Sequence, residues 1–169
     1  MKTAVHDASV LIDLVSTGLL GPWFKAGLVA VTSSLVWREV NRKTQKARLA
    51  RFVESGDLKI VSIGSEDMTR IVRLQADLPS RVTLEDASVL FLSSARETIM
   101  LTSDKVLRRC AVDRGIEVHG LLWVLDLLVS RGRILPNAAA DRLEQMAALG
   151  TGRLPEKECR QRIRKWRDK

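Results

Sequence analysis

Short runs of β-branched and aliphatic residues alternate along the chain with longer segments of helical period. The runs predict five strands, at residues 3–6, 28–32, 58–63, 98–102 and 116–119. Single strands that alternate with helices are typical of βα units, whose strands form a largely parallel sheet. The pattern therefore predicts an α/β fold with helices on both faces of the sheet.

Capping residues, Gly and Pro set the bounds of the helices between these strands. Ser33 or Ser34 can cap a long helix over residues 35–54, and Ser65 caps a helix that ends before Pro79. Thr83 caps a helix that runs to residue 96, with Asp86 placed to complete a short capping box. The remaining helices are expected at residues 9–16, 121–131 and 136–149. A short turn of helix starts at Gly21 and Pro22, and a further helix runs from Ser103 or Asp104 to residue 115.

The helical pattern is interrupted at residues 150–152, which divide the sequence into a domain at 1–149 and a basic C-terminal arm at 150–169. On the arm, Cys159, Ile163 and Trp166 recur at helical spacing and form an apolar stripe. The stripe is equally compatible with an arm that docks on a partner or second subunit and with one that folds back on its own domain. We predict that the arm takes part in a homodimer.

The chain has 28 basic and 20 acidic residues and a formal net charge of +8. Residues 151–169 contribute eight basic and three acidic side chains, and residues 42–51 contribute five basic side chains and no acid. The excess is therefore confined to the arm and one helix. Such segments suit a polyanionic partner, either nucleic acid or an acidic protein.

Several classes of protein are excluded by what the sequence lacks. Two distant cysteines, Cys110 and Cys159, argue against a disulfide framework and a structural zinc site. The N-terminal segment is interrupted by Asp7 and Asp13 and does not resemble a signal peptide, and the apolar run at 121–129 is too short to cross a bilayer. We therefore expect a cytoplasmic protein that makes no membrane contact.

Four acids are expected at one edge of the sheet, beyond the carboxyl ends of the strands, where open α/β sheets bind ligands. They are Asp7, Glu39, Asp86 and Asp104. Carboxylate oxygens suit Mg²⁺ or Mn²⁺. The alternative is that the aspartates only cap helices. Glu39 is placed too far into its expected helix to be a cap, and its apolar neighbours indicate a partly inward face, where a carboxylate needs a partner.

The same residues carry a family resemblance. The motifs, in chain order, are VHDASVLIDL, SSLVWREV, LEDASVLFLSSA and IMLTSDKVLRRCA, followed by GIEVHGLLWVLDLLVSRG. Over residues 3–149 they resemble those of PIN-domain ribonucleases, particularly the branch of VapC-type toxins. The resemblance implies a three-layer α/β/α sandwich and endonucleolytic cleavage of RNA with Mg²⁺ or Mn²⁺. It leaves open whether one or two ions bind.

By this resemblance the four acids are catalytic and hold the metal. Glu85 could replace Asp86 as a ligand, and Ser9 and Ser103 either orient a carboxylate or cap helices. We predict in-line attack that leaves a 5′-phosphate and a 3′-hydroxyl. The candidates for RNA binding, which could equally form a solvated basic face, are Arg38, Arg42, Lys43, Lys46 and Lys105.

The biological role has several alternatives. The chain could be the toxin of a toxin-antitoxin pair, with an antitoxin protein that covers the acidic edge, or a nuclease with a DNA or housekeeping role. A non-catalytic PIN-like binding module is the alternative from another class. The four tryptophans lie in apolar or amphipathic segments and are interpreted as packing residues.

Overall fold

The computed structural model describes residues 1–95, 97–148 and 154–168. Its centre is a parallel sheet of five strands in the order β3-β2-β1-β4-β5. On the central strand, Ala4 is paired with Ala30 on one side and with Ile99 on the other. The strands are β1 (Thr3–His6), β2 (Val29–Ser33), β3 (Leu58–Val61), β4 (Thr98–Leu101) and β5 (Val118–His119).

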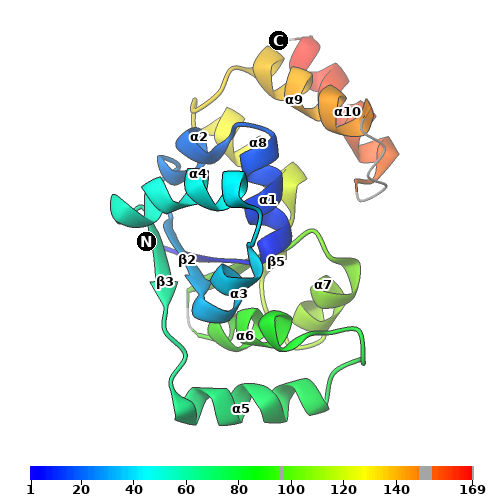
Figure 1. The fold of residues 1–169 in the computed structure, drawn as a ribbon. Coiled ribbons are helices and arrows are strands. Elements are labelled where there is room, and N and C mark those ends of the chain that lie inside the picture. The colour runs from blue at the N-terminus through cyan, green and yellow to red at the C-terminus, as the bar shows by residue number, and fades with distance from the viewer. Residues whose placement is uncertain (96, 149–153, 169) are drawn as a thin grey trace.

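Helices cover both faces of the sheet, which confirms the predicted three-layer α/β/α fold (Figure 1). Helices α1, α2, α4 and α8 lie on one side, and α5, α6 and α7 on the other. The helices are α1 (Ala8–Ser16), α2 (Leu20–Phe24), α3 (Ser34–Glu39), α4 (Lys43–Glu54), α5 (Ser65–Ala76), α6 (Leu84–Ser93), α7 (Lys105–Val112), α8 (Leu121–Ser130), α9 (Pro136–Ala148) and α10 (Glu156–Arg167).

The single helix predicted over residues 35–54 is wrong. The chain leaves the helix at Val40, whose ψ of 88° ends α3, and re-enters one only at Lys43. Val40 is 1% exposed, so the bend places its side chain in the core. Burial of this valine outweighs the helix-forming residues that follow it.

His6 ties the central strand to its neighbours from inside the core. Its Nδ1–H donates to the carbonyl of Val31 at 3.0 Å, and its Nε2 accepts from Nε1–H of Trp23 at 2.7 Å. Complete burial lowers the pKa of His6 to about 4, so the ring is neutral at physiological pH. His6 is therefore a packed histidine and not a candidate for acid-base chemistry.

The C-terminal helix α10 folds back along α9 (Figure 1). Cys159 and Trp166 are buried in the same core as the rest of the chain. Arg162 donates to Asp126 of α8 at 2.8 Å, and Arg167 donates to Asp141 and Glu144 of α9. Cys159 and Trp166, two residues of the apolar stripe, are therefore covered by their own chain. The homodimer stays a prediction.

The expected junction at residues 150–152, and with it the domain boundary at 149/150, lies outside the described residues.

Both cysteines are buried, and they form no disulfide with each other. Within the described part of the chain, every helix is too short or too polar to span a membrane.

Candidate active site

The four predicted acids come from four elements that meet at the carboxyl edge of the sheet. Asp7 follows β1 directly, and Asp104 precedes α7 just beyond β4. Asp86 lies in the first turn of α6, and Glu39 is the last residue of α3. Parallel strands place their carboxyl ends together, so residues from distant parts of the chain converge here.

Asp7 is the most deeply buried of the four, with 4% of its surface exposed. Its Oδ2 accepts hydrogen bonds from Ser9 Oγ at 2.6 Å and from Thr102 Oγ1 at 2.8 Å. Burial raises the pKa of Asp7, the two hydroxyl groups oppose that rise, and the charge of Asp104 adds to it. The fold thus holds a carboxylate where its ionised form is costly.

Asp86 and Asp104 cap helices, and the capping occupies one oxygen of each. Oδ2 of Asp86 accepts from the backbone N–H of Thr83 at 2.9 Å, which completes the predicted capping box. Oδ1 of Asp104 accepts from the backbone N–H of Leu107 at 2.7 Å. Capping by one oxygen fixes the carboxyl group and leaves the other oxygen for a second partner, so capping and metal binding are compatible roles.

The capping box can be tested on its own. Thr83→Ala removes the hydroxyl that accepts the backbone N–H of Asp86 at 3.1 Å, and we expect the free energy of unfolding to fall by about 1 kcal/mol. Thr83→Ser keeps the hydroxyl and serves as the control. Denaturant unfolding of the three proteins measures the effect, and equal stability of the Ala and Ser variants would contradict it.

Glu39 differs from its prediction in one respect. We expected a residue inside a helix with a partly inward face, but Glu39 ends α3 and is exposed as a whole residue. The chain turns away at Val40, and this exposes the glutamate at the edge of the sheet. Partial burial of its carboxyl group still raises its pKa, and Asp7, Asp86 and Glu85 raise it further.

The negative charges of the acids raise one another's pKa values at this edge of the sheet. Burial raises the pKa of Asp86, and the charges of Asp7 and Asp104 raise it further against the hydrogen bonds from Thr83. In the described ranges, none of the four forms an ion pair with Lys or Arg. The edge therefore concentrates negative charge, which a bound cation would stabilise.

The chemistry of this donor set fits a hard divalent cation, because all four side chains offer carboxylate oxygen. In the described part of the chain, no three His, Cys, Asp or Glu side chains lie close enough together to hold a metal ion as they stand. The mutual charge effects of the acids and their oxygen donors thus support a cation at this edge. The described side chains do not by themselves form a complete coordination geometry.

The two predicted serines link the acids to the helices around them. Ser9 contacts Asp7 and also accepts the backbone N–H of Ser103 at 3.0 Å. Ser103 Oγ donates to Asp13 Oδ2 at 2.7 Å. The sequence reasoning did not select Thr102 or Asp13 for the site. Asp13 could have been found from its position four residues after Ser9, on the same face of α1.

A family model described as a PIN domain matches residues 3–168. The chain belongs to the PIN domain family. The match extends from β1 to the end of α10 and so includes most of the predicted arm. PIN domains are generally nucleases, which are hydrolases, and typically use divalent metal ions.

One solved structure similar to this PIN domain is PAE2754 from Pyrobaculum aerophilum. The two chains are 20% identical, the match covers 79% of this chain and 91% of the other, and the TM-score is 0.49. A search of curated proteins found no match.

The cations predicted to bind RNA lie on exposed or half-exposed parts of the PIN domain. Arg38 is next to Glu39 on α3, and Arg42 and Lys43 are exposed where α4 begins. Lys46 lies over the ring of Trp37, 5.1 Å from its centroid. Lys105 is exposed at the first position of α7, next to Asp104. Their role in binding stays a prediction.

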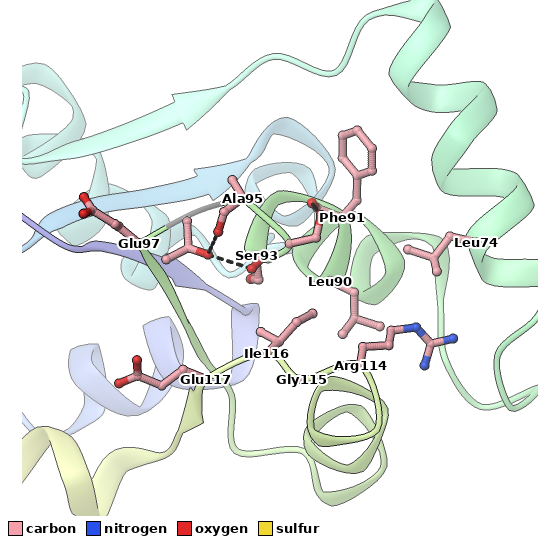
Figure 2. Close-up of a pocket in the computed structure, with 12 residues that line it drawn as sticks. Leu74, Leu90, Phe91, Ser93, Ala95, Glu97, Arg114, Gly115, Ile116 and Glu117 are labelled. Carbon is pink, nitrogen blue, oxygen red and sulfur yellow. Dashed lines mark hydrogen bonds between the residues drawn. The ribbon is translucent and has the colours of Figure 1, made fainter.

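A separate cavity of about 590 Å³ lies at the opposite end of β4 from the acids, and Figure 2 shows its lining. The hydroxyl of Thr98 donates hydrogen bonds to the carbonyls of Ser93 and Ala95 at 2.6 Å each. Glu117 pairs with Lys2 at 2.6 Å. These polar groups are engaged within the chain, so the acidic edge, and not this cavity, is the candidate active site of the PIN domain.

Proposed function

We propose that this PIN domain is an endoribonuclease that uses Mg²⁺ or Mn²⁺ held by Asp7, Glu39, Asp86 and Asp104. The observation that carries the proposal is the uncompensated cluster of carboxylates at the carboxyl edge, where the pKa values of Asp7, Asp86 and Glu39 are all raised. A structural role would favour paired or well-solvated acids. A cluster that is costly without a cation is expected where a cation binds.

Asp86 is preferred over Glu85 as the ligand. The charges of Asp7 and Asp104 both raise the pKa of Asp86, and the charge of Asp86 in turn raises the pKa of Glu39. The capping box also fixes Asp86 at the start of α6. Asp86 is therefore the carboxylate at this turn that belongs to the cluster.

Hydrogen bonds from neighbouring groups fix the positions of three of the acids in the absence of substrate. Ser9 and Thr102 hold Oδ2 of Asp7, and the N–H groups of Thr83 and Leu107 each hold one oxygen of Asp86 and Asp104. A divalent cation, when bound, supplies Lewis-acid chemistry: it lowers the pKa of water and offsets charge on the phosphate. Carboxylates fixed in advance need little reorganisation during the reaction.

The experiment that tests the proposal is incubation of the protein with single-stranded RNA in Mg²⁺, in Mn²⁺ and in EDTA. We expect cleavage in either metal, products with 5′-phosphate and 3′-hydroxyl ends, and loss of cleavage in EDTA that added metal reverses. Single-stranded DNA of the same sequence tests the DNA alternative. Absence of RNA cleavage under every metal condition would contradict the proposal and favour a non-catalytic binding module.

We further propose that the enzyme acts as a toxin restrained by an antitoxin protein. This role is supported by the resemblance of its motifs to those of VapC-type toxins. An antitoxin that covers the acidic edge would block access to Asp7 and Asp104. Growth arrest on expression, relieved by Asp7→Asn, is the expected outcome, and unimpaired growth with active enzyme would favour a housekeeping nuclease.

A further inference from the structure

A second cavity, of about 460 Å³, lies beside the acidic edge between α7, the start of α8 and α10. Its volume is within the range of about 300 to 1,000 Å³ that is typical of ligand pockets. Ser103, which precedes Asp104, is part of its wall. The cavity therefore adjoins the proposed active site.

Cations dominate the charged side chains of this cavity. Among the described residues that line it, Lys105, Arg108 and Arg162 are basic and Glu158 is acidic. Arg162 is already paired with Asp126 and Glu158. Lys105 and Arg108, by contrast, form no ion pair with any residue in the described ranges. Among the described residues, these two cations thus have no acidic partner.

Arg108 is held in place by the chain that carries the acids. It is half-buried, and one of its guanidinium N–H groups donates to the carbonyl of Thr102 at 3.2 Å. The hydroxyl of the same threonine donates to Asp7. A guanidinium has five N–H donors in a planar fork that suits phosphate oxygens. Arg108 therefore presents an anion-binding group that is linked to Asp7 through Thr102.

Gly120 makes room for this arginine. A Cβ added at Gly120 would overlap Nη2 of Arg108. The backbone of Gly120, with φ of −121°, is open to any residue, so the glycine is not required by its own conformation. A side chain at Gly120 would instead push the end of the Arg108 side chain away from its present position.

Part of the wall is aromatic. The rings of His119 and Trp123 stack with centroids 4.2 Å apart and planes inclined by 7°, and both residues line the cavity. Trp123 packs against the core, as the sequence suggested, and is half-buried. Cations beside a stacked aromatic pair suit a nucleotide, which combines phosphate with a planar base.

We propose that this cavity is a subsite for a nucleotide of the single-stranded RNA substrate, with the phosphate bound by Arg108 and Lys105. The proposal rests on the proposed ribonuclease function, because a strand cut at the acids must place neighbouring phosphates nearby. Helix α10 contributes Arg162 and Glu158 to the wall of this cavity.

The test measures RNA binding separately from cleavage, by fluorescence anisotropy of a labelled oligouridine about ten nucleotides long. The Asp7→Asn protein in Mg²⁺ serves as the background. We expect Arg108→Gln to weaken binding about tenfold and to reduce the slope of log K against log salt by about one. The matched control is Arg109→Gln, which removes an exposed arginine from the same helix and is expected to change binding less than about twofold.

Gly120→Ala distinguishes a positioned cation from net charge alone. It retains every charge but displaces the guanidinium of Arg108, so it should weaken binding in the same direction as Arg108→Gln. Equal effects of Arg108→Gln and Arg109→Gln, or a folded Gly120→Ala protein with unchanged binding, would overturn the subsite. An RNA-binding protein that fails to cleave RNA would contradict the proposed function alone, so the two failures are distinguishable.

Discussion

Replacing Asp7 by Asn should abolish metal-dependent RNA cleavage and at the same time give a more stable protein. Loss of a group that only supports a metal ligand typically costs 10- to 100-fold in affinity or activity, so loss of a ligand should cost at least about 100-fold. Asn keeps an oxygen that can accept from Ser9 and Thr102. The fold should therefore survive the substitution.

The gain in stability follows from the raised pKa of Asp7. Because its folded pKa lies above the unfolded value of about 3.9, ionised Asp7 lowers the stability of the native state at neutral pH. The cost is absent below the unfolded pKa and grows as the pH rises through the folded pKa. In EDTA, Asp7→Asn should thus melt above wild type at pH 7, with the difference shrinking toward pH 4. Each kcal/mol corresponds to about 2 to 4 °C.

Asp57→Asn is the matched control for this substitution. Asp57 Oδ2 accepts from Ser55 Oγ at 2.6 Å, as Asp7 does from Ser9, but it lies exposed in the turn between α4 and β3. It should leave both cleavage and melting temperature nearly unchanged. Full cleavage by Asp7→Asn, or a lower melting temperature than wild type at pH 7, would show that Asp7 is a structural carboxylate.

Replacing Trp166 by Ala should lower the free energy of unfolding by about 3 to 5 kcal/mol. Trp166 is 2% exposed and belongs to the main core, although it lies in the last turn of α10. Removal of a buried indole leaves a cavity that its neighbours fill only in part. Denaturant unfolding measures the loss.

Lys165→Ala is the neighbouring control, since Lys165 is exposed and surface substitutions usually change stability by less than about 0.5 kcal/mol. Light scattering on the same proteins tests the alternative role of the helix. A Trp166→Ala protein with unchanged stability but reduced mass would mean that α10 packs on a second subunit.

The acidic edge could be predicted from sequence because strand ends and helix caps are local features. A strand followed by Asp7, and another followed by Asp104, must meet at one edge once both strands are parallel. Thr83 and Asp86 have the spacing of a capping box, and the structure confirms it. These inferences need only residues that are neighbours in the chain.

Other parts of the site depend on contacts that the sequence does not display. Thr102 reaches Asp7 across 95 positions, and Ser103 reaches Asp13 across 90. The bend at Val40, which exposes Glu39, follows from burial of one valine in a core built by distant elements. The apolar stripe of α10 has the same pattern whether it packs on its own chain or on another.

The most direct test of a cation at the acidic edge is a calorimetric titration of Mn²⁺ into wild type and into Asp7→Asn. The wild-type protein should bind Mn²⁺ saturably, and the variant should bind it at least about 100 times more weakly. Equal affinity of the two proteins, or no binding by wild type, would contradict the assignment of these carboxylates as the metal site.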